Sequence, residues 1–120
     1  MNDYPQFVKD IIEQLGGLGF RGAPGYVGGH DFLYVRPEVA HPLYPHPHDG
    51  IFQFKTNTKK KSVMLIAVEL MDTYYVALFI EGQPYGEPYS GVYCDQLKKL
   101  VEDMYDGYIK EQQGGGIHLS

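Results

Sequence analysis

Three histidines and an aspartate lie close together in a proline-rich segment that ends near residue 50. They are His41, His46, His48 and Asp49. Imidazole and carboxylate groups are common ligands of zinc and other divalent transition metals. Side chains alternate along an extended chain, so His46 and His48 would point to the same side. The segment supports the hypothesis of a metal-dependent hydrolase, in which three ligands and a water hold the metal. The alternative is a solvated loop whose histidines pack or cap locally.

Tyrosine is the second residue type that suggests a site. The chain contains 11 Tyr and no Trp, and several tyrosines lie in stretches rich in glycine and proline. Aromatic side chains on loops are frequent anchors of binding surfaces. They also serve to fix loops to a core, because one end of the ring can be dry and the other wet. The ligand-binding residues predicted on this basis are Tyr26, Tyr34, Tyr85 and Tyr89, with Arg21 and Arg36 as charged contacts.

Composition narrows the class of protein. The 120 residues carry 10 Lys+Arg against 15 Asp+Glu, a net charge of −5, which disfavours nucleic acid as a partner. No apolar run is long enough to predict a membrane span. Cys94 is the single cysteine and cannot form an internal disulfide, which fits a reducing compartment. The first residues show no signal-peptide pattern, so a cytoplasmic location is expected.

Hydrophobic periodicity and turn residues predict the order of the elements. Apolar side chains recur at helical spacing near both ends of the chain, and β-branched and aromatic runs separated by turn signals lie between them. The expected elements are a helix over about 5–15, a glycine-rich loop over 16–29 with a short strand near 18–21, strands over 31–36, 51–56, 62–70 and 74–81, a loop over 82–93 and a helix over about 95–110. We expect Asn2 or Asp3 to cap the first helix and Asp95 to cap the last.

These elements predict a single α+β domain over residues 1–113, followed by a flexible tail over 114–120. Its antiparallel sheet would have four or five strands, with the N-terminal and C-terminal helices packed on one face. The two central strands are apolar on both faces, so the second face also needs a cover. Loops between residues 16 and 50 or a second copy of the chain could provide it. We therefore expect a homo-oligomer, most simply a dimer.

The resulting functional prediction is a small, non-catalytic ligand-binding or protein-interaction domain without a cofactor. A small molecule or a protein would be its partner, and neither nucleic acid nor membrane is expected. The alternative is the hydrolase with zinc or another divalent transition metal on the histidine segment. Glu69 lies within an apolar strand and has two interpretations. It is either a buried acid with a raised pKa or a carboxylate at a wet edge.

Overall fold

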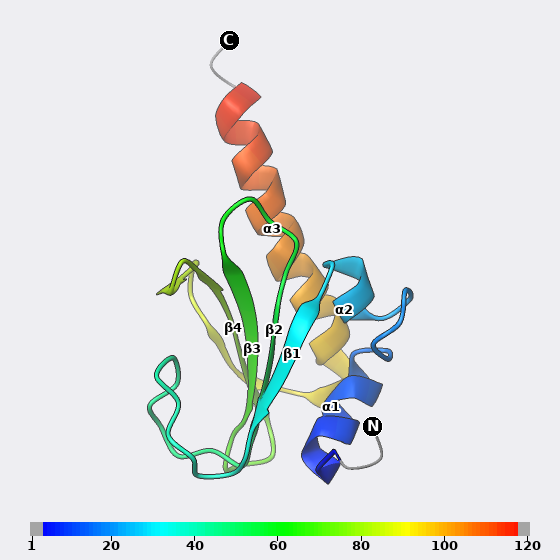
Figure 1. The fold of residues 1–120 in the computed structure, drawn as a ribbon, viewed down its shortest axis with the longest axis vertical. Coiled ribbons are helices and arrows are strands. Elements are labelled where there is room, and N and C mark those ends of the chain that lie inside the picture. The colour runs from blue at the N-terminus through cyan, green and yellow to red at the C-terminus, as the bar shows by residue number, and fades with distance from the viewer. Residues whose placement is uncertain (1–3, 118–120) are drawn as a thin grey trace.

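The computed structural model describes the backbone of residues 4–117 and the side chains of residues 4–112. It confirms the predicted α+β domain, which has an antiparallel sheet, an N-terminal helix and a C-terminal helix (Figure 1). The elements are α1 (Gln6–Gln14), α2 (Ala23–Tyr26), β1 (His30–Val35), β2 (Ile51–Lys55), β3 (Ser62–Val68), β4 (Tyr74–Ile80), β5 (Gln83–Pro84), β6 (Tyr89–Val92), the short 3-10 helix η1 (Cys94–Gln96) and α3 (Leu97–Ile117).

The sheet is an antiparallel meander with a divided edge. Its order is β1-β2-β3-β4, and both β5 and β6 pair with the outer edge of β4. The prediction of a loop over 82–93 is wrong at both ends, because β5 and β6 are short strands there. Pro84 is compatible with this position, since an edge strand need not use every backbone N–H in the ladder. The segment between β5 and β6 leaves the sheet and carries Tyr85.

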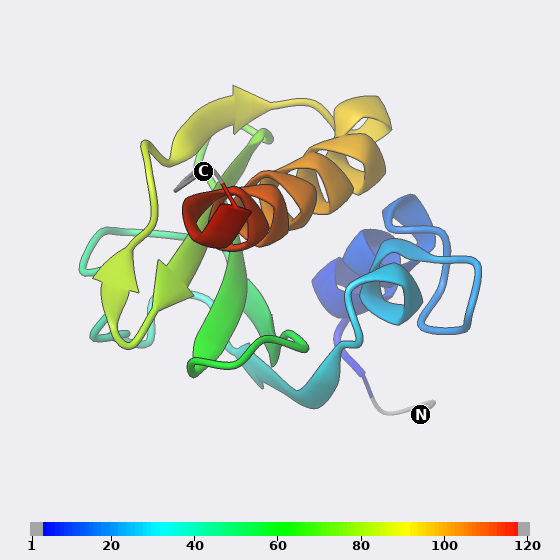
Figure 2. The ribbon, with the colours of Figure 1, turned by 90° about the horizontal axis from the view of Figure 1, so that it is seen from above.

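The three helices cover one face of the sheet, as Figures 1 and 2 show. α1 contributes Val8 and Ile11, and Leu15 follows as its C-cap; all three are fully buried and their spacing places them on one side of the helix. The main core formed between the helices and this face contains Val8, Ile11, Leu15, Ala23, Val27, Phe52, Phe54, Met64, Ile66, Tyr74, Val76, Leu78, Val92, Leu97, Val101 and Tyr108. Most of the buried apolar residues of the domain therefore lie on the helix side.

The glycine-rich loop differs from its prediction. The strand expected near 18–21 is absent, and α2 follows instead, with Pro24 in its first turn. Tight backbone packing explains the difference. A Cβ on Gly22 would lie 1.9 Å from the carbonyl oxygen of Gly17, so the chain folds back on itself here. An extended strand could not make that approach.

The helix ends also differ in detail from the prediction. α1 begins after Pro5 without a side-chain cap, and the predicted caps Asn2 and Asp3 lie outside the described residues. The cap predicted at Asp95 is wrong: the turn begins at Tyr93, whose backbone N–H donates to the Gln96 side chain over 3.0 Å. The backbone of α3 continues as helix to Ile117, beyond the predicted end at 110. The proposed tail over 114–120 stays a prediction.

The second face of the sheet is covered in part by the segment between β1 and β2, here called the 36–50 loop. Its Tyr44 ring packs against Tyr75 with centroids 4.6 Å apart. Tyr44 belongs to a second core cluster with Ile51, Leu65, Ala67, Ala77 and Phe79. A loop from within residues 16–50 thus covers part of this face, which is one of the two alternatives that we expected. The dimer stays a prediction, and a fully uncovered sheet face no longer motivates it.

Candidate functional site: a cleft between the 36–50 loop and the sheet

A cleft of about 520 Å³ remains where the 36–50 loop does not close completely over the second face of the sheet. We call it the loop cleft. Its lining is mainly apolar, with a few polar side chains: Leu33, Val35, Val39, Ala40, His41, Pro42, Leu43, Gln53, Lys55, Lys61, Val63, Phe79 and Gly82. This volume and this mixture of many apolar and few polar groups are typical of small-molecule sites.

Strand register places the floor of the loop cleft. Leu33 of β1 lies opposite Gln53 of β2, and Val63 of β3 lies opposite both Lys55 and Phe79. Side chains in a strand alternate between faces, so these residues share the face turned away from the helices. A bulge in β1 between His30 and Leu33 shifts the register before that point. The floor is therefore built by four strands, with the polar side chains coming from β2 and the β2–β3 connection.

His41 fixes the wall of the loop cleft to its floor. The backbone N–H of Leu43 donates to His41 Nδ1 over 3.0 Å, so the ring proton lies on Nε2. That proton is donated to Gln53 Oε1, with 2.6 Å between the two heavy atoms. The neutral imidazole thus joins the loop to β2 and uses both of its nitrogens.

His48 has the same arrangement deeper in the loop. Its side chain is only 1% exposed. Gly50 N–H donates to Nδ1 over 3.0 Å, and Nε2–H donates to the carbonyl of Val39 over 2.8 Å. Val39 lines the loop cleft, so His48 holds the cleft wall from behind. The buried polar ring is fully hydrogen-bonded, as buried polar groups generally are.

The geometry favours the structural interpretation of the histidine segment over the metal site. Ring nitrogens of His41 and His48 are engaged in hydrogen bonds, so a metal would have to displace those partners. His46 is exposed and packs edge-on against Tyr44, and Asp49 is exposed. Among the described residues, no group of three or more His, Cys, Asp or Glu side chains is placed to hold a metal ion.

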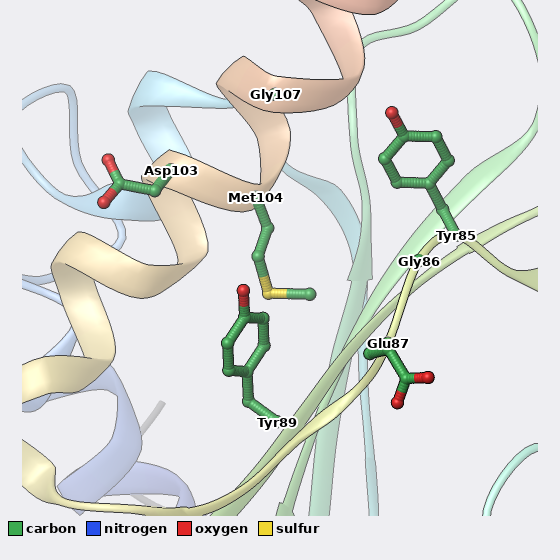
Figure 3. A pocket seen from close by; sticks show the side chains of 7 residues that line it. All are labelled: Tyr85, Gly86, Glu87, Tyr89, Asp103, Met104 and Gly107. Atoms are coloured by element: carbon green, nitrogen blue, oxygen red, sulfur yellow. The ribbon is translucent and has the colours of Figure 1, made fainter.

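Two of the predicted binding tyrosines meet in a second, smaller pocket. Tyr85 and Tyr89 line different sides of a space of about 210 Å³ between the β5–β6 segment and α3 (Figure 3). Met104 points into the gap, whereas the Asp103 carboxylate points away from it. Tyr85 also packs edge-on against Tyr108, with centroids 5.0 Å apart. Burial, followed by the Glu111 carboxylate, raises the pKa of Tyr85.

The other four predicted binding residues lie elsewhere. Tyr26 donates to both carboxylate oxygens of Asp106 at 2.8 Å, which raises the pKa of its phenol. Tyr34 packs edge-on against Tyr4 and Phe7 on the helix side of the sheet. The remaining two residues are cations on the surface. Arg36 lies over the Tyr34 ring, with 5.9 Å between its Cζ atom and the ring centroid, and Arg21 is exposed in the glycine-rich loop.

The six predicted residues therefore do not form one site, and none of them lines the loop cleft. The lining residues outside the predicted set of binding residues include Leu33, Gln53, Lys55, Lys61 and Phe79. One signal was present: Gln53 is a polar side chain in the middle of an apolar strand. Such a residue needs a polar partner or a polar surface.

Glu69 occupies the wet-edge position, and the alternative of a raised pKa is wrong. Burial alone would raise its pKa, but three hydrogen bonds outweigh that effect and lower it. The donors are the hydroxyls of Ser90 and Thr73, at 2.5 and 2.7 Å, and the backbone N–H of Gly91 at 2.8 Å. Glu69 therefore fastens β6 to the end of β3 as a carboxylate.

The fold and the cleft define the chain as a small α+β domain with a largely apolar cavity of a size that suits a small molecule. Comparison with models of protein families, with curated proteins and with solved structures finds no match. Within residues 4–117, none of the helices combines the length and the apolar character that a membrane crossing requires.

Proposed function

We propose that this chain is a non-catalytic ligand-binding domain whose site is the loop cleft. The observation that carries the proposal is the combination of a volume of about 520 Å³, an apolar floor and wall, and a small set of polar groups at defined positions. Sites for small molecules have this character because the apolar lining supplies affinity and the polar groups supply orientation.

The polar groups of the loop cleft favour binding over catalysis. A general base needs a free acceptor within reach of a substrate proton. Both nitrogens of His41, the imidazole in the lining, are already hydrogen-bonded. The other polar side chains there are an amide and two lysines. These groups can hold and orient a ligand without reacting with it.

An uncharged fluorescent probe tests this function without assuming the nature of a head group. We would titrate the protein with N-phenyl-1-naphthylamine, which brightens in apolar surroundings. Leu33 lines the cleft and is 51% exposed, whereas Leu70 lies outside the cleft in the β3–β4 turn and is 58% exposed. The two leucines therefore provide a matched pair of substitutions.

Replacement of Leu33 by Gln removes apolar contact from the cleft, so we expect about tenfold weaker probe binding. Leu70→Gln removes a similarly exposed side chain elsewhere and should leave the affinity unchanged. The proposal is overturned if the unmodified protein binds no probe, or if the two variants lose affinity equally.

A further inference from the structure

We propose that the loop cleft selects an amphipathic monoanion, a carboxylate carried on an aliphatic body. This inference rests on the proposed function and names the chemical class of its ligand. The body would lie on the apolar floor beneath the 36–50 loop, and the carboxylate would meet Gln53, Lys55 and Lys61.

The tautomer of His41 determines which group of the Gln53 amide is free to face the cleft. His41 Nε2 carries the ring proton, so the Gln53 atom that it contacts at 2.6 Å must be the carbonyl oxygen. The orientation of the amide is thereby fixed, and its NH₂ group is turned away from His41. That NH₂ has no hydrogen-bond partner among residues 4–112. Gln53 therefore offers the cleft a donor and not an acceptor.

Two lysines give the cleft a positive charge. Lys55 and Lys61 line the cleft, and no carboxylate side chain lines it with them. Lys55 is paired with Asp31 over 3.0 Å, but the two side chains are 42% and 63% exposed, so this pair is weak and exchangeable. Lys61 has no ion-pair partner within the described part of the chain. Every polar side chain offered to a ligand here is a donor or a cation, and the complementary ligand group is an anion.

The net charge around the two lysines indicates the charge of the ligand. Asp31 balances one of the two lysines, which leaves one positive charge to be matched by the ligand. No arginine lines the cleft, so no guanidinium group there can bind a phosphate through two parallel hydrogen bonds. A singly charged carboxylate is therefore a better match than a phosphate dianion. This local excess of positive charge occurs in a protein whose overall charge is −5.

The polarity of the cleft changes along its length, which gives the bound ligand a direction. Along the shared face, the register runs from Val35 and Ile51 near the 36–50 loop to Lys55 opposite Val63, and then to Lys61 at the β2–β3 connection. Figure 1 shows the 36–50 loop and the β2–β3 connection at opposite ends of the sheet. The cleft is thus apolar at the loop end and cationic at the other. An amphipathic ligand matches this gradient with its head toward the β2–β3 connection.

Displacement of the bound naphthylamine probe by eight-carbon ligands tests the assignment. We would compare octanoate, 1-octanol and octyltrimethylammonium, which share one chain length and differ in head-group charge. Octanoate should displace the probe at a concentration about tenfold lower than 1-octanol, and the cation should be the weakest. The octanoate advantage should shrink at high salt, because exposed charges are screened.

Two neighbouring lysines provide matched variants. Lys61→Gln should weaken octanoate about fivefold and leave 1-octanol unchanged. Lys60→Gln makes the same change of charge one residue away, outside the cleft lining, and should have little effect on either ligand. A similar loss in both variants would assign the attraction to a general basic surface and overturn the proposed head-group contact.

The outcomes separate the two proposals. If 1-octanol and octanoate displace the probe equally, the ligand class is wrong and the apolar binding function stands. If the cation binds best, the class is overturned in the same way. If the probe itself does not bind, the proposed function fails together with the inference.

Discussion

His41 and Gln53 are joined by a hydrogen bond of 2.6 Å that connects the 36–50 loop to β2. The bond fixes the tautomer of the imidazole and the orientation of the amide together, because Leu43 N–H already occupies the other ring nitrogen. It also defines where the cleft wall meets its floor. This contact thus joins the cleft wall to its floor and leaves the Gln53 NH₂ group as the donor that lines the cleft.

Replacement of His41 by Ala should loosen this wall. We expect a loss of about 1–2 kcal/mol in the free energy of unfolding, because Gln53 Oε1 and Leu43 N–H lose their partner. Urea denaturation measures this change, and the same variant should bind the naphthylamine probe more weakly. His46 is exposed and provides the control. His46→Ala should stay within about 0.5 kcal/mol of the unmodified protein. An equal loss in both variants would contradict a stabilising role of the hydrogen bonds of His41.

His48 should contribute more to stability than His41, and its contribution should not depend on a metal. Its ring is 1% exposed and carries two hydrogen bonds, so His48→Ala leaves both a cavity and unpaired backbone groups. We expect a loss of about 3 kcal/mol. The Tm of the unmodified protein should not change when EDTA is added to material that was purified without chelator. A fall in Tm with EDTA, restored by zinc, would show instead that a metal holds the loop.

The fold was predictable from the sequence because its signals are local. The apolar spacing of residues 7–15 and the β-branched runs in β3 and β4 specify a helix and strands wherever they occur. The requirement for a second cover on the sheet was also visible in the apolar character of both faces. Which segment covers it depends on the packing of Tyr44 against Tyr75, a contact between residues far apart in the chain. Local patterns do not specify that contact.

The candidate site was harder to predict for the same reason. Histidines and tyrosines drew attention because of their chemistry, yet His48 is a hydrogen-bonded buried ring and the half-buried Tyr34 packs against Tyr4 and Phe7. The loop cleft consists of ordinary residues such as Leu33 and Lys55, which strand register places on the same face of the sheet. The loop conformation then determines which of them line a cavity.

Tyr85 should contribute more to stability than Tyr89. The Tyr85 ring is half-buried and packs edge-on against Tyr108, whereas Tyr89 is 49% exposed. We expect Tyr85→Ala to cost about 2 kcal/mol and Tyr89→Ala less than about 1 kcal/mol. Urea denaturation of the two variants provides the comparison. Equal losses would contradict the view that Tyr85 fixes the β5–β6 segment to α3.

Glu69 should make the stability depend on pH in the acidic range. Its pKa is lowered in the folded protein, because the bonds from Ser90, Thr73 and Gly91 outweigh burial. A lowered folded pKa contributes stability that is fully present above about pH 4.3 and is lost as the pH falls through the folded value. At pH 7, Glu69→Gln should therefore cost on the order of 1 kcal/mol.

At an acidic pH below the folded pKa of Glu69, the difference between Glu69→Gln and the unmodified protein should shrink toward zero, because the carboxylate is then protonated. Urea denaturation at both pH values measures it. Glu87→Gln is the control, since Glu87 is an exposed carboxyl on the β5–β6 segment. A difference that stays constant with pH would mean that the charge of Glu69 does not hold β6.

The glycine-rich loop offers a test of backbone packing that does not involve the cleft. A Cβ at Gly22 would lie 1.9 Å from the Gly17 carbonyl oxygen, whereas a Cβ at Gly19 would meet nothing within 4 Å. Gly22→Ala should therefore cost about 2–3 kcal/mol, because the backbone must move to relieve the contact. Gly19→Ala should be neutral or slightly stabilising, since alanine restricts the unfolded chain.

Urea denaturation distinguishes the two variants, and a tolerated Gly22→Ala would show that residues 16–22 do not need the observed close packing. Octanoate affinity should be unchanged in Gly19→Ala, because this loop packs with the helices on the other face of the sheet.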